Sequence, residues 1–244
     1  MARTEIGVVE AIARYPVKSM GAETLLSAQL MWVGLHGDRQ YAFVRSGNRS
    51  RFPWLTARDV SDLVLHKARY GDPDDPRNAP VRVTTPDGQD YAIDDPALAE
   101  RLSSAACESV SLIQMGRGCF DAMPVSVVST TTLAALETAR GGAIGLERFR
   151  INLVIRAAPA AGRETDWLGG TLAFGASPSA ARVLLGWAIP RCAMVTVDPA
   201  TAERDPSVLR MVAQDFANEV GAYGSVAMTG TIEVGDRVWL DSPG

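Results

Sequence analysis

Apolar and polar residues alternate in short segments along most of the chain, a period that is typical of strands with one buried face. Gly, Asn and Asp residues separate these segments and predict tight turns. The Asp87-Gly88 pair predicts that residues 81–93 form a hairpin around this turn. We expect strands within residues 6–17, 25–33, 40–46, 62–70, 81–93, 108–115, 149–157, 169–175, 181–198 and 228–240.

Three further segments have the pattern of short helices. Residues 94–106 combine an acidic start and a proline with leucines at helical spacing. Residues 129–140 begin at Ser129 or Thr130, whose hydroxyl groups favour the N-cap position. Residues 206–218 place apolar side chains on one face. Because strands rarely alternate with these helices, the pattern predicts a mainly β fold and disfavours a doubly wound parallel sheet.

A change of pattern near the middle of the chain indicates two parts. The 244 residues can bury one large core or two modest ones. Polar residues 71–80 suit a surface loop in the first part, and glycine-flanked residues follow its last strand. We therefore expect a smaller N-terminal β domain over residues 1–119 and a second domain over residues 120–244, with the alternative that the first strands join the barrel of the second domain.

The chain is mildly acidic, with a net charge of -4, so no global positive field attracts nucleic acid. The N-terminal segment lacks a secretory apolar core, and no stretch has the roughly 20 apolar residues that span a bilayer. We expect a cytoplasmic protein without nucleic-acid or membrane partners. A local anion site stays open, because arginines are grouped at Arg45, Arg49, Arg51 and Arg58 and at Arg148, Arg150 and Arg156.

Three cysteines occur without a CxxC pair, which indicates a reducing compartment and excludes a four-cysteine iron–sulfur or zinc site within this chain. Cys192 is the candidate for chemistry, since it follows Arg191 at the expected entrance of a strand. A positive neighbour favours the thiolate, which attacks electrophiles and binds soft metals. The alternative is a small, buried core residue.

The sequence resembles the MOSC domain family, and in particular its two-part proteins, in which an N-terminal β-barrel domain precedes the MOSC core barrel. The resemblance covers almost the whole chain, and its motifs occur in the family's order. These motifs are RYPVKSM, GDRQYAFV, LTARDVSDLVL, CFDAMPVSVVSTTTLAAL, RFRINLVI, ETDWLGGTLAFG, RCAMVTVDPATAERDPSVLRMV and GTIEVGDRVWL. The chain departs from the family at Ala202, where relatives have glycine, and at Ala122 and Met123, which bears on substrate contacts.

The resemblance implies a bound molybdenum cofactor, Mo-molybdopterin, whose metal is ligated by Cys192. Asp121 is the second catalytic candidate, for handling a proton or a metal-bound water, and its alternative role is a turn aspartate that caps amides. Ser129 has helix capping as its alternative role. The residues implied to hold the cofactor are Lys18, Ser19, Arg39, Ser129, Arg150, Asn152 and Arg191. Arg150 and Asn152 are two apart, so in a strand they would share one face.

The function implied by the resemblance is the reduction of small N-hydroxylated compounds, with electrons from a separate electron-transfer protein or reductase. Pyridoxal phosphate binding is a further expectation at the level of the family. One alternative is a sulfur carrier or a carrier of the molybdenum cofactor, in which Cys192 bears a persulfide. Another is a β-barrel that has kept the fold and lost the cofactor.

Overall fold

The fold is mainly β, as the sequence predicts, in a computed structural model that describes residues 3–242. The helices are α1 (Pro96–Ala106), α2 (Thr130–Arg140) and α3 (Pro206–Asp215). The strands are β1 (Arg3–Arg14), β2 (Glu23–Leu25), β3 (Ser27–Met31), β4 (Gly34–Leu35), β5 (Tyr41–Arg45), β6 (Lys67–Tyr70), β7 (Val81–Thr84), β8 (Asp90–Ala92), β9 (Val110–Gln114), β10 (Val125–Ser129), β11 (Leu153–Ala157), β12 (Thr171–Phe174), β13 (Ala181–Pro190), β14 (Glu219–Met228), β15 (Gly230–Glu233) and β16 (Arg237–Asp241).

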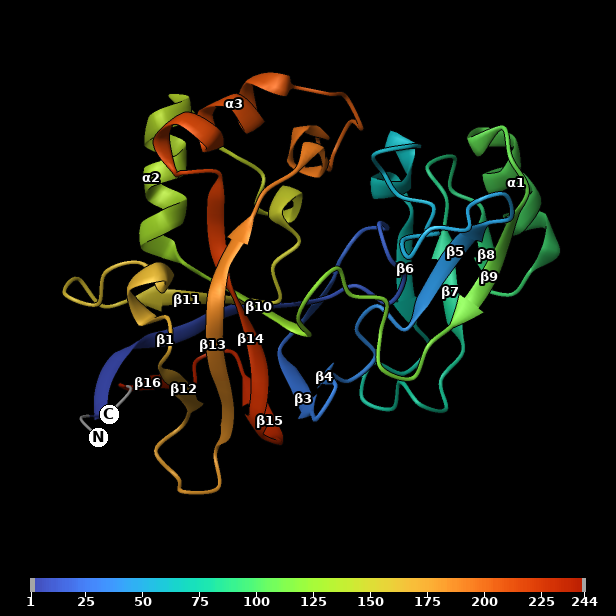
Figure 1. Cartoon of the computed structure of the whole chain (residues 1–244). Coiled ribbons are helices and arrows are strands. Elements are labelled where there is room, and N and C mark those ends of the chain that lie inside the picture. The colour runs from blue at the N-terminus through green and yellow to red at the C-terminus, as the bar shows by residue number, and fades with distance from the viewer. Residues whose placement is uncertain (1–2, 243–244) are drawn as a thin grey trace.

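Seven strands close into a barrel in the order β11-β10-β14-β13-β12-β16-β1, because β1 pairs with both β16 and β11 (Figure 1). Most pairs are antiparallel, while β10 and β11 run parallel. Gly7 permits the closure, since a Cβ at this position would clash with the carbonyl of Arg156 on β11. The N-terminal strand therefore joins the barrel that the second half of the chain builds.

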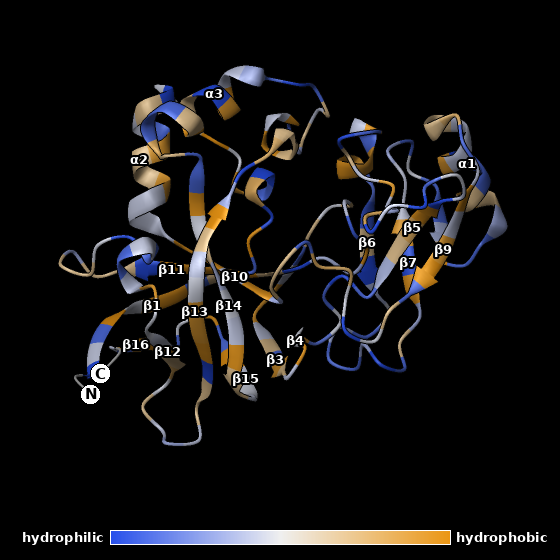
Figure 2. Ribbon diagram, in the orientation of Figure 1, coloured by the Kyte–Doolittle hydropathy of each residue, from blue (hydrophilic) through white to orange (hydrophobic). Residues whose placement is uncertain are grey.

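Alternation along the barrel strands directs one set of side chains inward. Ile12, Val127, Leu153 and Val183 are among the fully buried members of this core. Figure 2 shows hydrophobic residues along the barrel strands β10 and β13. The helices α2 and α3 pack on the outside of the barrel, where they bury a second cluster that includes Val195.

A smaller unit lies beside the barrel and is built from β5 to β9 and α1 (Figure 1). Its hairpin β7–β8 turns through Gly88, with φ of 83°, which confirms the Asp-Gly prediction. Asp95 caps α1 by accepting a hydrogen bond from the amide of Ala97 at 2.9 Å. The domain boundary near residue 120 stays a prediction.

The core of the smaller unit extends to the segment that follows Cys192, because Val197 and Ala202 are buried in it. Arg14 of β1 also joins the two units, since its Nη1 donates to the carbonyl of Pro73 at 3.0 Å. The segment after Cys192 is thus held by both cores, with Val195 in one cluster and Val197 in the other.

Local structure departs from the prediction at two short 3-10 helices. Residues 62–70 were expected to form one strand, but Ser61–Leu65 is a 3-10 helix and the strand starts at Lys67. The strand expected over residues 181–198 ends at Pro190, and Ala193–Thr196 is again a 3-10 helix. Such turns need only a few i to i+3 hydrogen bonds, so they leave little periodicity in a sequence.

Candidate functional site

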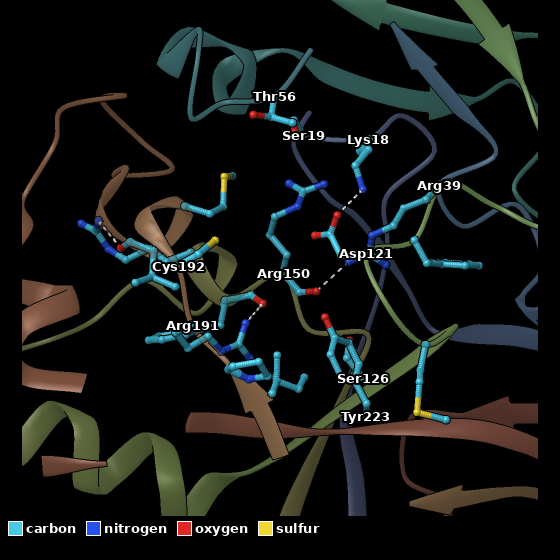
Figure 3. A pocket seen from close by; sticks show the side chains of 18 of the residues that line it. Lys18, Ser19, Arg39, Thr56, Asp121, Ser126, Arg150, Arg191, Cys192 and Tyr223 are labelled. Atoms are coloured by element: carbon cyan, nitrogen blue, oxygen red, sulfur yellow. Dashed lines mark hydrogen bonds and ion pairs between the residues drawn. The ribbon is translucent and has the colours of Figure 1, made fainter. Parts of the chain in front are cut away.

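A pocket at the junction of the barrel and the smaller unit collects eight of the nine predicted site residues, all except Ser129. Figure 3 shows Cys192, Arg150 and Asp121 around its interior. Six basic side chains and one acidic side chain line it, so the pocket is strongly positive in a chain with a net charge of -4. The lining residues are Lys18, Ser19, Arg39, Thr56, Arg58, Phe120, Asp121, Met123, Ser126, Arg148, Phe149, Arg150, Asn152, Ile189, Pro190, Arg191, Cys192, Met194, Val195 and Tyr223.

Cys192 lies just beyond the end of β13, and not at the entrance of a strand as the sequence suggested. It is the N-cap of the 3-10 helix Ala193–Thr196, and its carbonyl accepts from the amide of Val195 at 3.1 Å. The residue is exposed and lines the pocket, whereas Cys119 is buried. The reading of Cys192 as a buried core residue is therefore wrong.

Arg191 holds the end of β13 against its neighbours. Its Nε donates to the carbonyl of Val220 at 2.8 Å, and its Nη1 donates to the carbonyl of Phe149 at 2.9 Å. Burial lowers the pKa of Arg191 to about 10. The side chain still keeps its positive charge at neutral pH, directly beside Cys192 in the sequence.

Arg148 fixes the segment that carries Cys192. Its guanidinium pairs with Asp198, and its Nη1 donates to the carbonyl of Thr196 at 3.3 Å. Asp198 Oδ1 in turn accepts from the amide of Ala200 at 2.9 Å. This buried arginine thus holds the C-terminal end of the 3-10 helix at Thr196 and the side chain of Asp198 that follows it.

Arg39 and Arg150 both lie against the ring of the buried Tyr15, with guanidinium carbons 4.7 and 4.3 Å from the ring centre. Arg39 pairs with Asp38, and its Nη2 donates to the carbonyl of Arg150 at 2.8 Å. Arg150 has no carboxylate partner among residues 3–242, and its buried Nη2 has no hydrogen-bond partner there. Burial, followed by the charge of Arg39, lowers the pKa of Arg150 to about 10.

Three of the lining residues have positive φ although none is glycine: Ser19 at 68°, Arg39 at 51° and Arg150 at 52°. Such residues are uncommon, and they cluster at ligand sites, where the surrounding structure offsets their cost. Arg150 caps the 3-10 helix Leu146–Phe149 and is not part of β11. The expectation that Arg150 and Asn152 share a strand face was therefore wrong.

Asn152 serves the internal structure with its whole amide. Its Oδ1 accepts from Ser126 Oγ at 2.9 Å, and its Nδ2 donates to the carbonyl of Ala13 and to Asp38 Oδ2, both at 3.1 Å. Asp38 is therefore held by Asn152 as well as by Arg39. Asn152 lines the pocket and also orients the charged pair beside it.

Lys18 and Asp121 form an ion pair across the pocket (Figure 3). Lys18 Nζ donates to Asp121 Oδ1 at 2.8 Å and to the carbonyl of Cys119 at 2.6 Å. Burial lowers the pKa of Lys18. Partial desolvation acts to raise the pKa of Asp121, but the charge and hydrogen bond of Lys18 and the charge of Arg39 outweigh it and lower that pKa. Asp121 is thus a carboxylate at neutral pH.

The structure places Ser129 outside the pocket lining, fully buried at the start of α2. Its Oγ accepts from the amide of Thr132 at 3.1 Å, which confirms the predicted cap, and donates to Glu164 Oε2 at 2.8 Å. Glu164 also accepts from Thr132 Oγ1 at 2.7 Å and from the amide of Gly221 at 2.9 Å. This buried carboxylate links α2 to β14 next to Val220, the residue that holds Arg191.

Sequence reasoning did not single out several lining residues. Arg58 and Arg148 lie in the motifs LTARDVSDLVL and RFRINLVI and in the two arginine groups, but neither was named as a site residue. Tyr223 of β14 gave no sequence signal. Burial raises the pKa of Tyr223, and its ring meets that of Trp187 edge to face at 6.3 Å between ring centres.

The residues of the pocket suit a molybdopterin. Guanidinium and ammonium groups are donors for phosphate and for pterin oxygen atoms, and the unpartnered Arg150 Nη2 is a buried donor without an acceptor. A thiolate is a suitable ligand for a soft or high-valent metal. Within residues 3–242 no group of three or more His, Cys, Asp or Glu side chains can hold a metal ion, so Cys192 is not part of an all-protein site of that kind.

Comparison with known proteins gives the family. The MOSC N-terminal beta barrel domain matches residues 6–130, and the MOSC domain matches residues 116–239, half of the chain. The chain therefore belongs to the MOSC domain family, and the two-part organisation predicted from its motifs is confirmed. No curated protein matches the sequence.

A solved structure with the same fold is that of the YUAD protein from Bacillus subtilis. The TM-score is 0.53 and the sequence identity is 15%, over 100% of this chain and 99% of that chain. Family membership supports a function of the molybdenum-cofactor-binding or sulfur-carrier type. None of the helices in residues 3–242 has the length and apolar character to cross a membrane.

Proposed function

We propose that the protein is a molybdenum-cofactor-dependent reductase of small N-hydroxylated compounds, supplied with electrons by a separate protein. The observation that carries the proposal is the exposed Cys192 at a pocket lined by six basic side chains, one of which has an unpartnered buried donor. This combination of a soft metal ligand and anion donors is what a phosphorylated, metal-bearing pterin requires.

In this proposal Cys192 ligates the metal, and the pterin and its phosphate are held by the donors around it. Arg150 offers its free Nη2, Ser19 offers a hydroxyl group, and Arg39 adds charge. When bound, the cofactor supplies the two-electron redox chemistry that no side chain of this site supplies. Ser129 is the weakest member of the predicted set, because it is buried outside the pocket lining.

The reaction breaks the N–O bond of the substrate, consumes two electrons and two protons, and releases the oxygen as water. Asp121 is ionised at neutral pH and can accept a proton from solvent and pass it to the leaving oxygen. Lys18 keeps the Asp121 carboxylate in place through the 2.8 Å hydrogen bond. Arg191 keeps positive charge beside the Cys192 thiolate.

Turnover of N-hydroxybenzamidine tests the proposal. Protein produced in a molybdate-fed, cofactor-competent host is supplied with a reduced viologen dye, and formation of benzamidine is followed. We expect turnover by the wild type and loss of turnover in Cys192→Ser. We expect wild-type rates in Cys107→Ser, because the exposed Cys107 is the C-cap of α1 and does not line the pocket. A cofactor-loaded wild type that does not reduce the compound contradicts the proposal.

Sulfur transfer is the second candidate, and the exposure of Cys192 favours it, because a persulfide carrier must present its thiol to an acceptor. Mass spectrometry under non-reducing conditions separates the two functions. A mass increase of one sulfur atom on the Cys192 peptide supports transfer, whereas bound molybdenum with an unmodified peptide supports reduction.

A further inference from the structure

The six basic side chains of the pocket differ in their hydrogen-bond and ion-pair partners within the protein. Arg150 and Arg191 are half-buried and donate to backbone carbonyls. Three others are paired with carboxylates: Lys18 with Asp121, Arg39 with Asp38 and Arg148 with Asp198.

Arg58 is the sixth basic side chain, and it differs from the other five. It is exposed, and it makes no salt bridge with the described residues. Its side chain has one weak hydrogen bond, from Nε to Thr56 Oγ1 at 3.4 Å. Because it lines the same pocket as Cys192, its guanidinium is available at the mouth to an incoming anion.

The turn that carries Arg58 is rigidly held. Asp59 Oδ2 accepts from the amide of Thr56 at 3.2 Å and from Thr56 Oγ1 at 2.8 Å. Arg204 Nη2 donates to the carbonyl of Arg58 at 2.8 Å. Since Arg204 belongs to the segment that follows Cys192, the turn has a fixed position relative to the cysteine.

We propose that Arg58 is a specificity-determining residue that binds a carboxylate group of the substrate while the N-hydroxyl group faces the Cys192 side of the pocket. This inference rests on the proposed reductase function and adds to it a substrate class, N-hydroxylated compounds that bear a carboxylate. A guanidinium fits a carboxylate with two parallel hydrogen bonds, which a lysine cannot reproduce.

The strength of the effect follows from the exposure of Arg58. An exposed guanidinium is partly screened by water, so the gain in affinity is moderate, on the order of five- to tenfold at low salt. The gain falls as ionic strength rises. The other arginines of the pocket depend less on ionic strength, because salt screens buried and partly buried charges less.

The test compares N-hydroxybenzamidine with its 4-carboxylate, which differ by one negative charge. Dissociation constants are measured by calorimetry with the cofactor-loaded protein and no electron donor, for wild type, Arg58→Ala, Arg58→Lys and Arg51→Ala. Arg51 is the matched control, because it is exposed on the same segment and does not line the pocket.

We expect Arg58→Ala to weaken binding of the carboxylate about five- to tenfold and of the neutral compound less than about twofold. Arg58→Lys should retain part of the preference, and Arg51→Ala should retain all of it. Equal effects of Arg58→Ala on the two compounds, or no effect on either, overturn the proposal.

Turnover of the neutral compound by the wild type separates this inference from the function on which it rests. If the wild type reduces both compounds and Arg58→Ala does not discriminate, the reductase function stands and the role of Arg58 is wrong. If the carboxylate binds through Arg58 but neither compound is reduced, the anion site stands and the reductase function is wrong.

Discussion

Lys18 and Asp121 are 103 residues apart in the sequence, and the Lys18 ammonium donates to the Asp121 carboxylate at 2.8 Å. The pair joins the turn after β1 to the segment before β10, and it forms one wall of the pocket. Asp121 is the accessible partner, since its side chain is 68% exposed while that of Lys18 is 8% exposed. The carboxylate therefore faces the space in which a substrate would bind.

Removing the charge of Lys18 should raise the pKa of Asp121. In the wild type the pKa of Asp121 lies below the ordinary value of 3.8, because the charges of Lys18 and Arg39 outweigh desolvation. In Lys18→Met the main opposing charge is gone, so the titration of Asp121 moves to higher pH. Carboxyl carbon NMR of the cofactor-free protein measures the shift, with the exposed Lys67→Met as control. An unchanged titration contradicts the ion pair.

The sign of the stability change follows from the same pKa. A carboxylate whose pKa is lowered in the folded protein stabilises the fold at pH values above its pKa in the unfolded chain. This stabilisation is lost as the pH falls through the lowered pKa of the folded protein. Between pH 5 and pH 8 it is fully present. Acid should therefore destabilise the wild type more than Lys18→Met as the pH falls from about 5 to below 3.

Replacing Ser19 by glycine should give a more stable protein than replacing it by alanine. Both changes remove the hydroxyl group, but alanine at a φ of 68° keeps the contact between Cβ and backbone that disfavours this region. We expect Ser19→Gly to exceed Ser19→Ala by about 1 kcal/mol in the free energy of unfolding. Urea denaturation measures the difference, and equal stabilities would show that the left-handed conformation is absent in solution.

Glu164→Gln should destabilise the protein by roughly 2–4 kcal/mol. The buried carboxylate accepts four hydrogen bonds, from the amide and hydroxyl group of Ser129, from Thr132 and from Gly221. Glutamine turns one oxygen into a donor that faces other donors. The exposed Glu137→Gln on α2 is the control and should change the stability little. A loss below about 0.5 kcal/mol in Glu164→Gln would contradict this role.

Asp198→Asn isolates the charge that holds Arg148. Asparagine keeps Oδ1 as the acceptor for the amides of Ala200 and Thr201, while its neutral amide replaces the carboxylate oxygen that pairs with Arg148. We expect a loss of about 1–3 kcal/mol, because the Arg148 side chain is only 4% exposed. Hydrogen exchange should accelerate at the amides of Val195 and Val197. Unchanged exchange there would mean that the pair does not fix the cysteine segment.

Short-range signals in the sequence carried most of the element predictions. Ser129 caps α2 and the Asp-Gly pair turns a hairpin, because both depend on neighbouring backbone groups alone. The closure of the barrel by pairing of β1 with β11 is a contact over about 150 residues, and local patterning cannot register it. The turn after Cys192 was misread because a short 3-10 helix has no periodicity to detect.

In the candidate site, too, local features were predicted and long-range contacts were not. The motifs named eight residues that line the pocket, but neither the pairing of Lys18 with Asp121 nor the free guanidinium of Arg58 was visible in the sequence. These relationships depend on two units meeting at one surface. Ser129 illustrates the same contrast within one residue. Its local role as a helix cap was predicted, but its place outside the pocket lining was not.

The molybdenum and pterin content of the purified protein decides whether Cys192 holds a molybdenum cofactor. Metal analysis and pterin fluorescence are compared for wild type, Cys192→Ser and Cys107→Ser, all produced in the same molybdate-fed, cofactor-competent host. We expect molybdenum and pterin in near-equal amounts in wild type and Cys107→Ser, and loss of molybdenum in Cys192→Ser. A metal-free wild type, or a Cys192→Ser variant that retains molybdenum at the wild-type level, would contradict this role of Cys192.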